Sequence, residues 1–204
     1  MHSEQNTEKQ QALLSLGQHL KKEGYRFTTG TPLTHERVNG RSENRQAHDL
    51  PGVFGWSRPF EAPVLGDQLL GLLRAGGVLI EEGDQFASAV RWSSLGDNLF
   101  VHSRYPTVQS DAVFFGPDTY RFVRAIDAFL GMPSTAVVSR AVDICCGAGP
   151  GALCIAQARP AAQVLAVDIN PRALEFTRLN AALAGVSNVE ALYSDLLKDV
   201  DGEF

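Results

Sequence analysis

The sequence predicts an α/β fold, with a small α+β domain over residues 1–113 and the first three strands of a parallel sheet over residues 114–204. Two observations lead to this division. From residue 136 onward, strand-like and helix-like runs alternate with short connections, which is typical of a parallel sheet flanked by helices. Before that point, helical patterns precede three strand-like runs separated by turn residues.

The composition is that of an ordinary globular protein. The chain has 204 residues, of which 44% are hydrophobic and 20% are charged, and this content is enough to bury a core. No apolar run approaches the roughly 20 residues that span a bilayer, and the polar N-terminus has no apolar signal core. We therefore expect a cytoplasmic protein with no membrane partner.

The net charge of −5 argues against strong electrostatic binding of nucleic acid. Residues 141–204 hold four Lys or Arg against eight Asp or Glu, so a basic surface has to lie in the first part of the chain. The candidates there are Arg37, Arg41, Arg45 and Arg58. They either line a face that recognises RNA or are solvated loop charges, and an RNA- or protein-binding module is one alternative for this domain.

The N-terminal domain is predicted to contain two helices and a polar loop. Leucines at mostly helical spacing predict a helix over Thr7–Lys22 that closes at Gly24, and a second helix over Val64–Ala75. The stretch Phe27–Pro51 has too few apolar residues for a regular core element, so we expect a loop there.

Strand-like runs follow the second helix, at Val78–Ile80, Phe86–Trp92 and Leu99–His102. A helix that leads into a short hairpin is the pattern of a winged-helix-like unit, although a plain α+β appendage would have the same pattern. The segment Asp118–Leu130 returns to helical spacing, with Asp118 able to cap it and Gly131 and Pro133 ending it. Its expected inward face is Phe122, Ile126, Phe129 and Leu130.

A glycine-rich turn joins the first strand of the predicted sheet to a helix. The apolar run Ala136–Ile144 leads into Cys145-Cys146-Gly147-Ala148-Gly149-Pro150-Gly151, after which Ala152–Ala158 is helical in pattern. Glycines at such a junction let the backbone approach a ligand closely, and the amides at the helix start offer hydrogen-bond donors.

Carboxylates follow the predicted strands. Asp168 ends the strand Gln163–Val167, where an acid can accept hydrogen bonds from both ribose hydroxyls of a nucleoside. Ser194 and Asp195 follow the strand Val189–Tyr193, and Asn170 caps the intervening helix, which ends at Gly185. Because the carboxyl ends of parallel strands form the ligand crevice, we expect Asp143, Asp168 and Asp195 around one pocket.

The sequence is compatible with two classes of ligand in this pocket. Gly147, Gly149 and Ala152 also fit the looser G-x-G-x-x-A fingerprint of an NAD-binding Rossmann domain. Three acids, however, disfavour a pyrophosphate and suit a ligand with an ammonium group, hydroxyls and an exocyclic amine. S-adenosylmethionine fits that description. The three cysteines are expected to be small buried hydrophobes, and the five scattered histidines predict no metal site.

The runs VDICCGAGPGAL, AVDINPRALEFTRLNAALAG and ALYSDLL resemble the first three motifs of class I S-adenosylmethionine-dependent methyltransferases. They are most similar to the small methyltransferase group, which includes release-factor glutamine and ribosomal RNA guanine methyltransferases. The resemblance covers residues 136–204 and implies a Rossmann-like sheet with S-adenosyl-L-methionine as cofactor. One departure is that Cys145 stands where the family pattern D-x-G-x-G-x-G has its first glycine.

The resemblance also implies roles for single residues. The amino-acid part of the cofactor would lie among Asp143, Gly147 and Gly149, the ribose at Asp168 and the adenine amine at Asp195. The segment Phe115–Tyr120 looks like one that closes over the cofactor, where Thr119 or Asp118 either contacts it or caps a helix. Gly52–Pro59 looks like a segment of bacterial proteins of this type, and we assign it no role. The expected cofactor-binding residues are Asp143, Cys145, Gly147, Gly149, Asp168, Ile169, Ser194, Asp195 and Thr119.

In this group an Asn-Pro-Pro-Tyr turn after the fourth strand binds the methyl acceptor, and the chain has no such sequence before Phe204. We therefore expect an N-terminal fragment, inactive by itself, of an enzyme that methylates a nitrogen of a protein glutamine or of a nucleic-acid base. A non-catalytic scaffold is the alternative. The strand over residues 136–144 should keep one unpaired edge, which we expect to be covered by a second copy, by the N-terminal region or by other protein.

Overall fold

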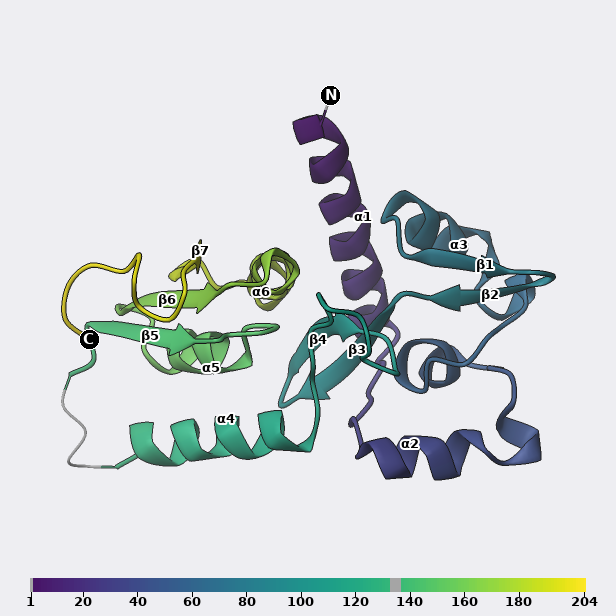
Figure 1. The fold of residues 1–204 in the computed structure, drawn as a ribbon, viewed down its shortest axis with the longest axis horizontal. Helices are drawn as coiled ribbons and strands as arrows, with labels where there is room; N and C mark the ends of the chain where they lie inside the picture. The colour runs from purple at the N-terminus through teal and green to yellow at the C-terminus, as the bar shows by residue number, and fades with distance from the viewer. Residues whose placement is uncertain (1, 133–136) are drawn as a thin grey trace. The chain divides into compact units, whose positions relative to one another are not determined.

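A computed structural model describes residues 2–132 and 137–204, which form two compact units, Met1–Val108 and Gln109–Phe204 (Figure 1). The observed architecture is α/β. The sequence places the boundary after residue 113, and a division into a recognition domain and a cofactor domain remains our proposal.

The N-terminal unit combines three helices with two antiparallel hairpins. Its helices are α1 (His2–Lys22), α2 (Pro32–Asn39) and α3 (Gly66–Ala75), and its strands are β1 (Leu79–Glu82), β2 (Gln85–Ser88), β3 (Val90–Leu95) and β4 (Asn98–Ser103). Short turns of helix lie at Ser42–Asn44, Pro51–Gly55 and Ala62–Val64. α1 packs against α3 (Figure 1). Leu16 and Leu20 of α1 are fully buried.

Two features of this unit differ from the sequence predictions. Part of the expected loop is the helix α2, which Thr31 caps by accepting a hydrogen bond from the Thr34 amide at 3.2 Å. The single expected strand over Phe86–Trp92 is divided between β2 and β3, which belong to separate two-stranded sheets. The winged-helix-like arrangement is therefore not confirmed.

The C-terminal unit is a three-stranded parallel sheet with helices packed against it. Its elements are α4 (Pro117–Leu130), β5 (Arg140–Ile144), α5 (Pro150–Ala158), β6 (Gln163–Asp168), α6 (Pro171–Ala184) and β7 (Val189–Tyr193). The strand order is β5-β6-β7 (Figure 1). The central strand β6 buries four consecutive apolar residues over 164–167. Strands covered on both faces are expected to show such continuous apolar runs.

Cap residues explain where α6 begins and ends. The Asn170 side chain accepts a hydrogen bond from the Arg172 amide at 3.0 Å, and Gly185 closes the helix at φ 71°. Asn170 and Gly185 were both predicted from the sequence for these positions, so the local signals are confirmed.

For α4, the predicted cap at Asp118 is wrong and the predicted buried face is only partly right, since Leu130 is buried and Ile126 is partly buried. Its N-cap is Gly116, whose amide donates to the Thr119 hydroxyl at 3.2 Å, whereas Asp118 pairs with Arg121. The buried residues of α4 are Val123 and Leu130, while Phe122 and Phe129 are about half exposed. Val123 thus takes the buried position that was predicted for Phe122, while Leu130 is buried as predicted. Pro133, the expected helix stop, lies outside the described residues.

β5 pairs with β6 alone among the residues that the structure describes. The expectation of one unpaired edge is consistent with this pairing, and what covers that edge, self-association included, stays a prediction. No helix in the described part of the chain is both long and apolar enough to cross a membrane.

Candidate functional site

The glycine-rich loop between β5 and α5 has an alternating backbone. Cys145, Gly147 and Gly149 have φ values of 57°, 55° and 80°, and the residues between them do not have positive φ. Alternation of this kind turns successive amides toward one side of a loop and creates a concave surface for electron-rich groups. In this loop the amides of Cys146, Gly147 and Gly149 donate to Val167, Asp168 and Cys146, so among residues 146–149 only the Ala148 amide is left to donate to a ligand.

Asp168, at the end of β6, accepts a hydrogen bond from the glycine-rich loop through one carboxylate oxygen and one from the N-cap of α6 through the other. Oδ2 accepts a hydrogen bond from the Gly147 amide at 2.9 Å, and Oδ1 accepts one from the Asn170 amide at 2.9 Å. A carboxylate has about four lone-pair sites, so about two remain after these bonds. Asp168 thus fixes the loop and keeps acceptor capacity for a ligand.

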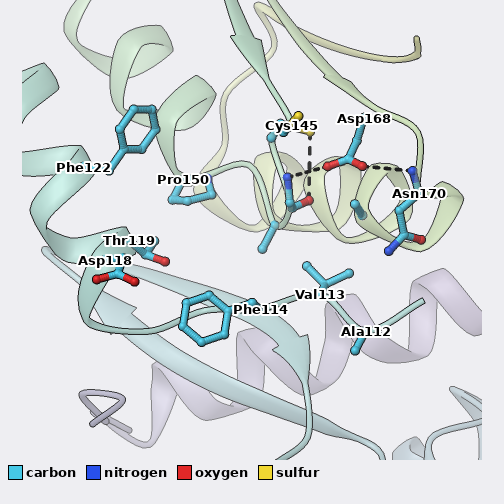
Figure 2. A pocket seen from close by; sticks show the side chains of 14 residues that line it. Ala112, Val113, Phe114, Asp118, Thr119, Phe122, Cys145, Pro150, Asp168 and Asn170 are labelled. Carbon is cyan, nitrogen blue, oxygen red and sulfur yellow. Dashed lines mark hydrogen bonds between the residues drawn. The ribbon is translucent and has the colours of Figure 1, made fainter. Parts of the chain in front are cut away.

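A cavity of about 430 Å³ lies beside the loop, within the range of roughly 300–1,000 Å³ that is usual for small-ligand sites. Figure 2 shows Asp168 between the loop and Asn170 on one side, and Val113, Phe114, Asp118 and Thr119 on another. The lining residues are Ala112, Val113, Phe114, Asp118, Thr119, Phe122, Cys145, Cys146, Gly147, Ala148, Pro150, Asp168, Asn170 and Ala173.

Asp143, in β5, lies behind the loop rather than in the cavity wall. Its side chain is buried, and Oδ2 accepts a hydrogen bond from the Ala152 amide in the first turn of α5 at 2.8 Å. Burial raises the pKa of Asp143 to about 6, while the Ala152 hydrogen bond lowers this pKa and the nearby Asp168 charge raises it further. Gly151 makes room for the carboxylate, since a Cβ there would lie 2.8 Å from Oδ2.

The structure brings some of the expected cofactor-binding residues together and leaves others apart. Thr119, Cys145, Gly147 and Asp168 line the cavity. Gly149 faces Thr177 instead, and Ile169 is 60% exposed. Ser194 is buried, with its hydroxyl accepting from the Asp199 amide at 3.2 Å.

Asp195 lies in the turn after β7, where its carboxylate pairs with Lys198. Asp143 and Asp168 are close enough for their charges to interact, but of the three expected carboxylates only Asp168 lines the cavity. The expectation that all three surround one pocket is therefore wrong for Asp195, and Asp143 lies next to the pocket without forming its wall.

The segment just before α4 forms a wall that the sequence predictions missed. Ala112, Val113 and Phe114 line the cavity, and Asp111 joins them to α6. The Asp111 carbonyl accepts a hydrogen bond from the Asn170 side chain at 2.9 Å, and its carboxylate pairs with Arg172 at 3.1 Å. The periodicity of this short segment did not indicate that it lines the cavity. The only related prediction was the helix cap at Asn170, whose side chain contacts Asp111.

The expectation that all three cysteines are buried is wrong for Cys145. Cys146 is buried and Cys154 is partly buried, but Cys145 is exposed and lines the cavity. With φ at 57°, Cys145 adopts the left-handed conformation that the family's glycine would adopt without strain.

We expect Cys145→Gly to raise the free energy of unfolding by about 0.5–1 kcal/mol. A residue with a side chain pays roughly 1–2 kcal/mol to adopt the left-handed backbone conformation, and glycine removes this cost. The greater freedom of glycine in the unfolded chain offsets roughly 0.4–1 kcal/mol of the stability gained in this way. Urea unfolding measures the difference. Cys145→Ala is the matched control, because it keeps a Cβ and should bring no such gain. Equal stability of the glycine and alanine variants would contradict the strain argument.

Comparison with known proteins identifies relatives of the C-terminal unit. Residues 127–204 match the family model of the methyltransferase small domain. A release factor glutamine methyltransferase from Mycolicibacterium smegmatis is 45% identical over 73 residues, which are 35% of this chain and 25% of that protein. The chain therefore spans about a quarter of the length of this curated relative.

Solved structures resemble parts of the chain. M. jannaschii TYW2 in complex with AdoMet aligns with a TM-score of 0.41 and 19% identity, over 52% of this chain and 44% of that chain. A putative transferase from Pyrococcus horikoshii aligns with a TM-score of 0.44 and 19% identity, over 70% of this chain and 49% of that chain.

Proposed function

We propose that this chain, in which residues 127–204 match the methyltransferase small domain, binds S-adenosylmethionine in the cavity beside the glycine-rich loop. It would act as the cofactor-binding part of an enzyme that methylates nitrogen. Its relative from M. smegmatis is a release factor glutamine methyltransferase, which favours a protein glutamine over a nucleic-acid base as acceptor.

The arrangement of Asp168 is the observation that carries this proposal. Its two oxygens are each held by one backbone amide, so the remaining lone pairs have fixed directions. Because a ribose presents two adjacent hydroxyls, a carboxylate with about two free acceptor sites suits it without rearrangement. The cavity volume is also in the range expected for a nucleoside ligand.

The same arrangement disfavours a dinucleotide. A pyrophosphate in a Rossmann fold needs the amides of the glycine-rich turn, yet the Gly147 amide already donates to Asp168. Asp143, directly behind the turn, would add repulsion whenever it is ionised. S-adenosylmethionine, which carries an ammonium group and a sulfonium, is the better match for these acids.

Isothermal titration calorimetry with S-adenosylhomocysteine and with NAD tests the proposal. We expect saturable binding of S-adenosylhomocysteine and no measurable binding of NAD at the same concentrations. Binding of NAD without any response to S-adenosylhomocysteine would overturn the assignment of the cavity.

A second function is favoured for the N-terminal unit by its arginines. Arg26, Arg74 and Arg104 form ion pairs with acids, whereas no ion pair involves the exposed side chains of Arg37, Arg41 and Arg45 in the described chain. Arg58 lies over the Trp56 ring, 5.7 Å from its centroid. Exposed arginines without ion pairs can contact phosphates, and an arginine stacked on an aromatic ring can stack with a base, so these residues suit single-stranded RNA.

Filter binding across salt concentrations tests this second function. If the three arginines contact phosphates, Arg37→Gln, Arg41→Gln and Arg45→Gln together should reduce the slope of log affinity against log salt by about 2, since each contact to a single strand contributes roughly 0.7. Solvated loop charges, the alternative, would give no RNA binding by the unaltered chain, or a slope that the triple variant leaves unchanged.

A further inference from the structure

Two fully buried polar side chains on α6 contact the glycine-rich loop without lining the cavity. The Thr177 hydroxyl donates to the Gly147 carbonyl at 3.1 Å, and the Asn180 amide donates to the Ala148 carbonyl at 2.9 Å. Neither residue is part of the cavity wall. Any effect that they have on a ligand must therefore be transmitted through the loop backbone.

The direction of the Thr177 hydrogen bond follows from its other neighbour. The Cys146 sulfur lies 3.5 Å from the Thr177 oxygen, and burial raises the pKa of this thiol to about 12. The thiol therefore keeps its proton and can donate it to Thr177 at 3.5 Å or, over a longer distance of 4.0 Å, to the Gly147 carbonyl. Since a hydroxyl has one proton, that of Thr177 stays available for the Gly147 carbonyl.

The Gly147 carbonyl in turn orients the next amide. In a planar trans peptide the carbonyl and the N–H point in opposite directions, so a carbonyl held toward α6 directs the Ala148 N–H away from α6. Ala148 lines the cavity, and no described residue accepts a hydrogen bond from its amide. The amides on either side are already engaged, Gly147 with Asp168 and Gly149 with the Cys146 carbonyl at 2.8 Å.

We infer that Thr177 is a positioning residue that holds the Gly147–Ala148 peptide so that the Ala148 amide donates to the carboxylate of bound S-adenosylmethionine. The inference rests on the proposed function. An amide at the approach to a helix N-terminus is well suited to a carboxylate, because the helix dipole favours negative charge there. Asn180 supports the same geometry by holding the following carbonyl.

Calorimetry with two ligands separates positioning from general stability. Thr177→Val keeps the shape of the side chain and removes the hydroxyl. It should weaken S-adenosylhomocysteine binding about tenfold, the loss of roughly one charge-assisted hydrogen bond. The affinity for 5′-methylthioadenosine, which has the nucleoside but no carboxylate, should not change. Thr177→Ser should restore S-adenosylhomocysteine binding, and Glu175→Gln, an exposed change on the same helix, is the surface control.

Each other outcome has a separate meaning. An equal loss for both ligands, or no loss for either, would overturn the positioning role while leaving the proposed cofactor site in place. If the unaltered chain binds neither ligand, the proposed function fails and the inference fails with it. Should the valine variant not fold, Thr177→Ala removes the same hydroxyl with a smaller side chain, and the same difference between ligands is expected.

Discussion

Replacing Asp168 by asparagine is expected to weaken S-adenosylhomocysteine binding by about 100-fold, the largest effect on affinity that we predict. The native carboxylate accepts from the Gly147 and Asn170 amides and has acceptor sites left for two ribose hydroxyls. An asparagine has one acceptor oxygen, and its NH₂ group, which only donates, would face the backbone amide or ribose hydroxyl that the second carboxylate oxygen serves. The loss corresponds to about two charge-assisted hydrogen bonds of roughly 1.5 kcal/mol each.

Calorimetric titration of Asp168→Asn and of the unaltered chain measures this loss, with Glu175→Gln as the charge-matched control. The variant should also unfold more easily, by about 1–3 kcal/mol, because a loop amide loses its acceptor. If affinity falls no further than in the control, Asp168 does not contact the ligand. If the variant then loses stability but not affinity, the role of Asp168 is to stabilise the loop through the Gly147 amide.

Most of the loop and its acid could be predicted because their signals are local. Gly147 and Gly149 need positive φ, Asn170 caps the helix that follows, and Asp168 ends a strand whose residues 164–167 are all buried. Each of these features depends on neighbours within a few residues in the chain. Sequence spacing is then enough to place them on one edge of a sheet.

The features that the sequence did not reveal depend on contacts between distant segments. The wall at Ala112–Phe114 is held by Asp111 through Arg172, 61 positions away, and no local pattern encodes such a pairing. The sequence predicts a loop in place of α2 because the one buried side chain of this helix is polar: His35 lies 2.7 Å from the Arg91 guanidinium. The Thr31-Pro32 pair, a cap followed by a first-turn proline, was the signal that could have identified it.

α4 shows how a correct helix can have a wrongly placed face. Phe122 and Phe129 dominate its apolar pattern, so the prediction turned them inward. In the structure Val123 and Leu130 are buried, and Phe122 lies at the cavity wall with half of its surface exposed. A large aromatic side chain at a ligand site is apolar without belonging to the core, and spacing alone does not distinguish these two positions.

Replacing Asp143 by asparagine should change how stability depends on pH, by up to about 3 kcal/mol. The native carboxyl has a pKa of about 6 in the folded protein and 3.8 as its ordinary value, chiefly because it is buried. Between these values the unfolded chain releases the proton while the folded chain retains it. Raising the pH through this window therefore favours unfolding, by about 1.4 kcal/mol per unit of pKa difference.

Asparagine has no such titration, and its oxygen can still accept the hydrogen bond from the Ala152 amide. Urea unfolding of both proteins at a series of pH values from 4 to 8 measures the difference. The stability of the variant relative to the unaltered chain should rise between pH 4 and pH 6 and then level off. A flat difference would mean that the pKa of Asp143 is the same in the folded and the unfolded chain, which contradicts the prediction. A falling difference would mean that the Ala152 amide and the start of α5 stabilise the carboxylate more than burial destabilises it.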